Sequence, residues 1–333
     1  KRQIHGAGAM AVREVGPYLL AVADESARDE MRDRGIAFEV LDGDVEGRTY
    51  YTADIRNERL AQIADARVDI LKRHGRAIVF KASPEAAETL AADGIEIARV
   101  FMSPMRLIPE IRPIPPAFPT QLNPAIVEMV DSVSIDRINA RVQRLQDFGT
   151  RYSSHDSCLA AANWIKNQFE SAGIDSVYFH KWAERYHPNV VAVIPGSANP
   201  DKIVIIGGHY DSITSNIDIC PGADDNASGT ACILECADAL AAHEFDYTIV
   251  FVAFCAEEQG LIGSEAFASE AAARGDDIVA MIAVDMIGYL ASKDQVDLDI
   301  IDNPSSTWLR ERAMAVGGLY VPQLSVVHGT LTG

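Results

Sequence analysis

The sequence predicts an α/β domain with a mainly parallel central sheet flanked by helices, preceded by a small α+β domain. Four apolar runs show little polar alternation, as in strands buried on both faces: 189–194, 203–206, 248–254 and 278–284. Helical hydrophobic patterns occupy 133–147, 158–172 and 227–242. Strands and helices that alternate along a chain indicate an α/β fold in which most of the sheet is parallel.

Residues 1–103 contain an internal repeat. A strand pattern at 18–23, a helical stretch and a glycine stop at Gly35 precede a short apolar run. The same order recurs from 77–82 to Gly94, with Leu20 and Val79 at equivalent positions. Each unit has the pattern strand, helix, glycine, strand. Two such units predict a ferredoxin-like α+β sandwich. We find no chemistry-bearing motif in it and expect an accessory or propeptide-like domain.

A proline-rich stretch at 104–125 separates this part from residues 126–333. Proline continues neither a helix nor a central strand, so we expect an extended linker. Seven prolines lie in it: Pro104, Pro109, Pro113, Pro115, Pro116, Pro119 and Pro124.

The length and net charge of the chain indicate its domain number and exclude some classes of binding partner. A chain of 333 residues suits two domains. The net charge of -19 argues against nucleic acid and against an anionic membrane surface as partners. No apolar run approaches the roughly 20 residues of a membrane helix. Because the chain begins with Lys1, we expect that an upstream segment has been removed.

The five cysteines show neither a CxxC pair nor zinc-finger spacing. We interpret Cys232, Cys236 and Cys255 as packing residues, because they lie in apolar stretches. Cys158 and Cys220 could form a disulfide if the protein is exported, a point that the sequence leaves open.

Acidic and histidine side chains gather where the predicted strands end. His209 follows one strand, Glu257 and Glu258 the next, and Asp285 a third, while Asp224 precedes a helix. Ligand sites of open α/β sheets lie at the carboxyl ends of the strands. So many carboxylates repel one another unless a cation compensates them. Imidazole with carboxylates suits zinc, and a shared carboxylate can hold two ions.

Four motifs resemble the M28 family of metallopeptidases, of the bacterial aminopeptidase type, in the family's order. They are GGHYDS, PGADDNASG, FCAEEQGLIGSEAF and AVDMIGY. The resemblance covers about residues 126–333 and implies an aminopeptidase-like phosphorylase/hydrolase fold. It also implies a zinc exopeptidase that removes N-terminal residues from peptides and holds two Zn²⁺ ions per active site.

The resemblance assigns roles to individual residues. His209 and Asp285 would bind the first zinc, Asp224 would bridge both ions, and Glu258 would bind the second. Glu257 would act as the general base toward the metal-bridging water.

Two aspartates have supporting roles in the family. Asp211 would orient the second nitrogen of His209. The family also carries a cis peptide bond between two aspartates, which implies one between Asp224 and Asp225. An anionic cleft favours an N-terminal ammonium group, which agrees with an aminopeptidase rather than a carboxypeptidase.

One departure from the family concerns the second zinc. The family takes a distal histidine from a Ser-Asp-His motif, and this sequence ends at Gly333 without one. We therefore expect a C-terminally incomplete catalytic domain, with His328 as the alternative ligand.

Two other functions remain open at this stage. One is a single-zinc acyltransferase similar to glutaminyl cyclases, which metal stoichiometry would separate from the peptidase. The other is a catalytically silent binding module of the same fold, which the intact Glu257 argues against. The family's habit of export suggests a secreted or periplasmic protein. Neither the preferred N-terminal residue nor the oligomeric state follows from the sequence.

Overall fold

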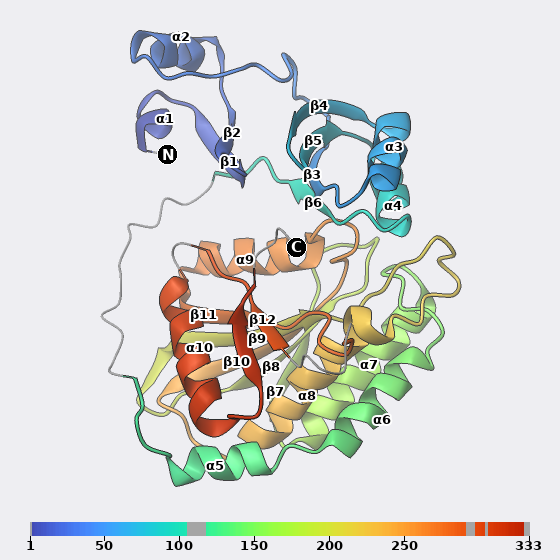
Figure 1. Ribbon diagram of the computed structural model, residues 1–333, viewed down its shortest axis with the longest axis vertical. Coiled ribbons are helices and arrows are strands. Elements are labelled where there is room, and N and C mark those ends of the chain that lie inside the picture. Colours follow the sequence, from blue (N-terminus) through green and yellow to red (C-terminus); the bar gives the residue numbers. More distant parts are fainter. Residues whose placement is uncertain (1, 105–117, 291–296, 304–305, 330–333) are drawn as a thin grey trace. The chain divides into compact units, whose positions relative to one another are not determined.

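The computed structural model describes residues 2–104, 118–290, 297–303 and 306–329 (Figure 1). The chain divides into two compact units. The first comprises Lys1–Pro109 with Ile213–Ile217 and Ala256–Ile262, and the second comprises the remainder. Residues 105–117 of the expected linker lie outside the described residues. The 1–103, 104–125 and 126–333 boundaries stay a prediction.

A mixed five-stranded sheet forms the centre of the second unit, in the order β11-β9-β10-β8-β7. Its strands are β7 (Ser176–His180), β8 (Asn189–Ile194), β9 (Asn199–His209), β10 (Tyr247–Phe254) and β11 (Asp277–Ala283). The pairs β10–β9 and β11–β9 are parallel, whereas β10–β8 and β7–β8 are antiparallel. Our prediction of a mainly parallel sheet is therefore wrong for half of the pairings. An apolar run indicates that a strand is buried on both faces. It does not indicate whether the strand pairs parallel or antiparallel with its neighbours.

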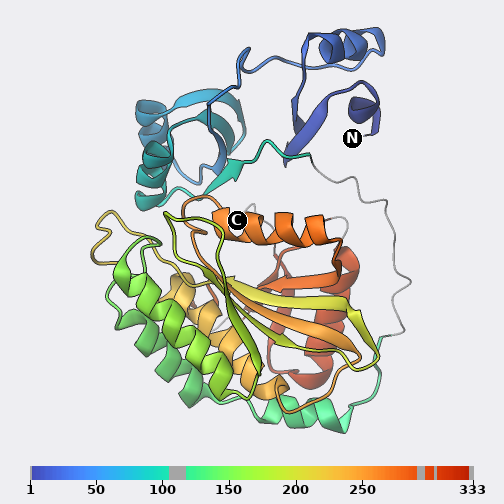
Figure 2. The same ribbon diagram turned by 180° about the vertical axis from the view of Figure 1, so that it is seen from behind.

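Helices cover both faces of this sheet (Figures 1 and 2). On one face lie α6 (Ile135–Gln146), α7 (Asp156–Ser171) and α8 (Gly229–Leu240), and on the other lies α9 (Ile262–Arg274). The ring of Phe169 on α7 packs 5.9 Å from that of Phe251 on β10. Phe267 of α9 packs at the same distance from Phe254 on the opposite face. The predicted helices and strands of this region are confirmed to within a few residues.

A buried ionic network joins α6 to α8. The carboxylate of Glu235, on α8, is 2% exposed and lies 2.7 Å from Nη1 of Arg141. It also accepts hydrogen bonds from Nε of Arg137 and from the main-chain N–H of Ser134, at 3.1 and 2.6 Å. Arg141 donates a further bond of 2.6 Å to Asp238. Pairing of this kind compensates charges that would be costly to bury alone.

A short helical segment, η1 (Ala223–Ser228), directly precedes α8. The other elements that the structure describes in the second unit are a two-stranded parallel pair and two helices. They are α5 (Pro124–Asp131), β12 (Asp297–Ile300), α10 (Thr307–Tyr320) and β13 (Ser325–His328). Over the residues described, no helix combines the length and apolarity needed to cross a membrane.

The first unit contains two small antiparallel sheets. A hairpin of β1 (Met10–Val15) and β2 (Tyr18–Val22) accompanies α1 (Arg2–Gly6) and α2 (Glu25–Asp33). The second sheet has the order β4-β5-β3-β6. It is built from β3 (Tyr50–Asp54), α3 (Glu58–Arg67), β4 (Asp69–His74), β5 (Ala77–Lys81), α4 (Pro84–Ala92) and β6 (Ile97–Val100).

The β-α-β-β-α-β order of the second sheet is that of a ferredoxin-like sandwich. Our repeat prediction is wrong about which residues form it, because the four strands all come from residues 50–100. The strand expected after Gly35 does not form. Phe38 and Val40 in that run are 37% and 48% exposed, so the run does not pack against another part of the chain as a buried strand would. Its apolar pattern was therefore not enough to predict a strand.

Candidate metal centre

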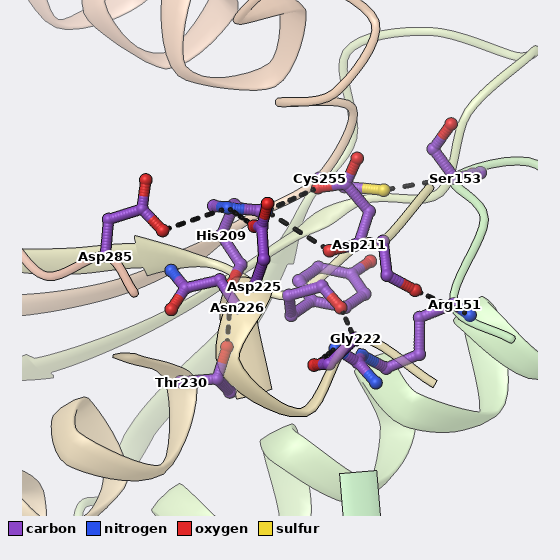
Figure 3. A network of polar contacts seen from close by, with 12 residues as sticks. Arg151, Ser153, His209, Asp211, Gly222, Asp225, Asn226, Thr230, Cys255 and Asp285 are labelled. Atoms are coloured by element: carbon purple, nitrogen blue, oxygen red, sulfur yellow. Dashed lines mark hydrogen bonds and ion pairs between the residues drawn. The ribbon is translucent and has the colours of Figure 1, made fainter. Parts of the chain in front are cut away.

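Three side chains from three segments converge at the carboxyl end of the parallel strands (Figure 3). His209 ends β9, Asp285 follows β11, and Asp225 lies in η1, directly before α8. Nε2 of His209 is 3.1 Å from Oδ1 of Asp225 and 3.4 Å from Oδ1 of Asp285. One donor atom from each residue lies within 4.8 Å of the others.

The imidazole of His209 is 4% exposed and held from its other side. Nδ1 lies 3.2 Å from the main-chain oxygen of Asp211 and 3.5 Å from its Oδ1. Both atoms are acceptors, so this side of the ring suits a proton on Nδ1. A neutral imidazole then presents a lone pair at Nε2, toward two carboxylate oxygens. Three acceptor atoms at these distances require a cation among them, either a metal ion or a proton.

The residues fit zinc by their donor chemistry, because imidazole nitrogen and carboxylate oxygen are ligands that this ion takes. The side chains of Asp225 and Asp285 are 46% and 54% exposed, so the group is open to solvent on one side. Open positions distinguish catalytic zinc sites from structural ones, whose coordination is filled by protein.

The structure places Asp225, rather than Asp224, beside His209. Oδ1 of Asp224 instead accepts hydrogen bonds from the main-chain N–H of Gly288 and from Oγ of Ser228, at 2.7 and 3.3 Å. The carboxylate of Asp224 thus anchors the segment that follows Asp285. Among the described residues, the group that could hold a metal ion therefore contains Asp225 and not the Asp224 that we expected, and the role of a bridging ligand stays a prediction. The expected position of the cis peptide bond is also wrong, since the bond joins Asp225 to Asn226.

Asn226 ties the end of β11 to the start of α8. Its Nδ2 donates to the main-chain oxygen of Val284, at 2.9 Å, and its Oδ1 accepts from the N–H of Gly229, at 2.8 Å. A Cβ on Gly229 would lie 2.4 Å from that Val284 oxygen, and one on Gly208 would lie 2.7 Å from it. The glycines of the GGHYDS and PGADDNASG motifs therefore permit the close approach that brings Asp285 to His209.

The segment 256–262 carries Glu257 and Glu258, both half-buried, and groups with the first compact unit. The main-chain oxygen of Glu257 accepts from the N–H groups of Gly260 and Leu261, both at 2.8 Å. Ala256 and Leu261 adopt positive φ angles of 57° and 65°. Non-glycine residues in this conformation are uncommon and concentrate at functional sites. The roles of Glu257 as base and Glu258 as ligand stay predictions.

Asn189, on β8, bonds to the two residues that flank this segment, Cys255 and Gly263. Its Oδ1 accepts from the N–H of Cys255 and its Nδ2 donates to the main-chain oxygen of Gly263, both at 2.8 Å. Asn189 is fully buried, so water does not compete for these hydrogen bonds. A further contact comes from Thr230, whose Oγ1 donates to the main-chain oxygen of His209 at 2.7 Å. The sequence analysis did not identify Asn189, Asn226 or Thr230. No spacing rule singles out such isolated polar residues.

His328 does not join the group around His209. Its Nε2 lies 2.9 Å from Oδ1 of Asp302. No disulfide joins Cys158 to Cys220; Sγ of Cys158 lies 3.9 Å from that of Cys255. Burial, with a hydrogen bond to Cys158, raises the pKa of the Cys255 thiol, so this residue is not poised as a nucleophile.

Comparison with known proteins finds a family and several relatives that resemble part of this chain. Residues 189–323 match the model of Peptidase family M28. A "Probable leucine aminopeptidase" of Arthroderma otae is 34% identical over 176 residues, which cover 48% of each chain. A "Probable zinc metalloprotease" of Pyrenophora teres f. teres is 35% identical over 193 residues, 50% of this chain and 42% of that protein. The chain thus spans about half the length of the curated relatives it matches.

A solved structure shares the fold over most of the chain. The LapA aminopeptidase of Legionella pneumophila superposes with a TM-score of 0.67 at 20% identity, covering 84% of this chain and 80% of that one. The family match includes His209, Asp225 and Asp285. Over residues 189–323, the chain is therefore similar to Peptidase family M28.

Proposed function

We propose that the protein is a zinc-dependent aminopeptidase that removes N-terminal residues from peptides. The observation that carries the proposal is the convergence of Asp225 and Asp285 on Nε2 of His209, whose Nδ1 is committed to Asp211. The names of the relatives, a leucine aminopeptidase and a zinc metalloprotease, support the same chemistry.

In this proposal His209, Asp225, Asp285 and Glu258 would together hold two zinc ions, with His209 and Asp285 at the first, Glu258 at the second and Asp225 shared between them. When bound, the zinc ions polarise the scissile carbonyl and lower the pKa of a coordinated water. Asp211 keeps the proton of His209 on Nδ1, so that Nε2 offers its lone pair to the metal.

Glu257 carries the proton transfers of the reaction. Its carboxylate takes a proton from the attacking water and returns it to the amine nitrogen as the C–N bond breaks. One water and one peptide bond thereby become a carboxylic acid and an amine, and the proton of the acid passes to the amine to give a carboxylate and an ammonium group. The net charge of -19 makes an N-terminal ammonium group the favoured end of the substrate.

The test compares the wild-type protein with Glu257→Gln for zinc content and for hydrolysis of amino-acid p-nitroanilides. We expect about two zinc ions per chain in both proteins and a loss of turnover of about 10²–10⁴-fold in the variant. Full turnover in Glu257→Gln would refute its role as the base. A wild-type protein with one zinc ion that cyclises N-terminal glutamine instead would identify an acyltransferase.

A further inference from the structure

Arg151 is a fully buried cation that the proposed reaction does not use. Its guanidinium donates to main-chain oxygens of three separate segments. Nε lies 2.7 Å from the oxygen of Tyr210, and Nη2 lies 2.8 Å from that of Gly222. Nη1 lies 2.7 Å from the oxygen of Pro221 and 3.0 Å from that of Leu145. Burying a guanidinium is costly without such bonds, so this arrangement depends on all these segments remaining in place.

Two of these segments carry the candidate metal ligands. Tyr210 directly follows His209, and Gly222 lies three residues before Asp225 in the same turn. Figure 3 shows Arg151 beside Gly222, with Asp225 and His209 in the adjoining part of the network. One buried side chain thus connects the backbone next to His209 with the backbone near Asp225.

Main-chain and hydroxyl contacts reinforce this connection. The N–H of Ser212 donates to the oxygen of Arg151, and the N–H of Arg151 donates to Oγ of Ser212, both at 3.2 Å. The same hydroxyl donates to the main-chain oxygen of Cys220, at 2.7 Å. The N–H of Cys220 donates to the oxygen of Gly149, at 2.9 Å. Residues 149–151 therefore lie between the two ligand-bearing segments and bond to both.

The packing around Gly222 leaves no room for adjustment. Gly222 has a φ of 45°, in the left-handed region that favours glycine. A Cβ there would lie 2.3 Å from the main-chain oxygen of Asp225, 2.7 Å from Cβ of Ser212 and 3.0 Å from Nη2 of Arg151. The turn that presents Asp225 is therefore pressed directly against the guanidinium.

We propose that Arg151 is a positioning residue that sets the separation between the ligands His209 and Asp225. It acts through the two backbones and does not contact the metal. The planar guanidinium donates along several fixed directions, whereas the ammonium of lysine concentrates three donors at one point. Lysine would keep the charge and lose this simultaneous connection. The inference rests on the metal centre of the proposed function.

The experiment compares Arg151→Lys with Arg141→Lys, a matched control. Arg141 is also a buried arginine of the second unit, and it bonds to the carboxylates of Glu235 and Asp238 instead. Zinc affinity is measured by chelator competition on the apo protein, and stability by thermal unfolding of the same apo samples. Loss of an outer partner of a metal ligand typically weakens binding by 10–100-fold, which is the effect expected for Arg151→Lys. Arg141→Lys should lower the Tm while leaving zinc affinity within about 2-fold.

Equal zinc affinity in Arg151→Lys and the wild type would overturn the inference, as would equal losses in both lysine variants. If Arg151→Lys does not fold, Ser212→Ala decides, because it removes one hydroxyl from the same connection. We expect it to weaken zinc binding by about 2- to 10-fold, and unchanged affinity there overturns the inference. Wild-type protein that binds zinc without hydrolysing peptides would refute the aminopeptidase proposal alone. Wild-type protein that binds no zinc would refute both.

Discussion

The adjacent aspartates of the ADDN turn provide the sharpest test of the metal centre. Asp225→Asn removes a carboxylate charge that faces Nε2 of His209 at 3.1 Å. Asp224→Asn removes the neighbouring charge, whose carboxylate instead accepts from the N–H of Gly288. The two variants have the same composition and change the net charge equally. Only the place of the lost charge differs between them.

The expected magnitude follows from the geometry. A carboxylate and a doubly charged zinc ion about 4 Å apart interact by about 8 kcal/mol at an effective dielectric constant near 20. Because the side chain of Asp225 is 46% exposed, solvent screening reduces this figure, and we expect a loss of about 2–4 kcal/mol of zinc-binding free energy. That is a rise of about 30- to 700-fold in the zinc Kd. The amide oxygen of Asp224→Asn can still accept from Gly288, so its cost is about 1 kcal/mol, or about 5-fold.

The assay is zinc competition against a chromophoric chelator, with circular dichroism on both variants to show that they are folded. A zinc Kd that rises more in Asp224→Asn than in Asp225→Asn would refute the assignment of Asp225. Equal and small changes in both would show that neither carboxylate binds the ion.

Two further predictions concern stability. Gly229→Ala places a methyl group 2.3 Å from Oδ1 of Asn226, so we expect thermal unfolding to show a loss of about 1–3 kcal/mol. Gly318→Ala, on α10, meets nothing within 4 Å and should instead stabilise the protein by about 0.5–1 kcal/mol; equal Tm values in both variants would contradict the packing argument. Burial raises the pKa of Glu235, but hydrogen bonds from Arg137 and the Ser134 N–H outweigh it, so the folded pKa lies below its usual range. A lowered folded pKa stabilises the protein above the unfolded value of about 4.3, and this contribution is lost as the pH falls through the folded pKa. The Tm of Glu235→Gln should therefore decrease less than that of the wild type when the pH is lowered from about 5 to 3. An equal decrease of Tm in both proteins would contradict this.

Much of the candidate site could be predicted from sequence. Each of His209, Glu257, Glu258 and Asp285 comes within a few residues of the end of an apolar run. Apolar runs of that kind are typical of buried strands, and ligand sites lie at the carboxyl ends of such strands. The helix and strand positions of residues 133–284 follow from periodicity in the same way, because periodicity is a local property of the chain.

The connecting residues were not predictable. Arg151, Asn189 and Asn226 form their bonds with residues distant in sequence, and an isolated polar residue carries no periodic signal. Burial gives these residues their importance, and burial of one polar side chain is decided by all the elements that pack around it.

By itself, the sequence determined that a histidine and several carboxylates meet at the ends of buried strands, and that this chemistry suits zinc. Only the tertiary structure decided which of two adjacent aspartates faces His209, because neighbouring residues of a turn point in different directions set by the backbone around them. It also decided the directions of β7 and β8 and the residues of the ferredoxin-like sheet. Strand pairing depends on contacts between distant segments, and an apolar pattern specifies burial without specifying the partner.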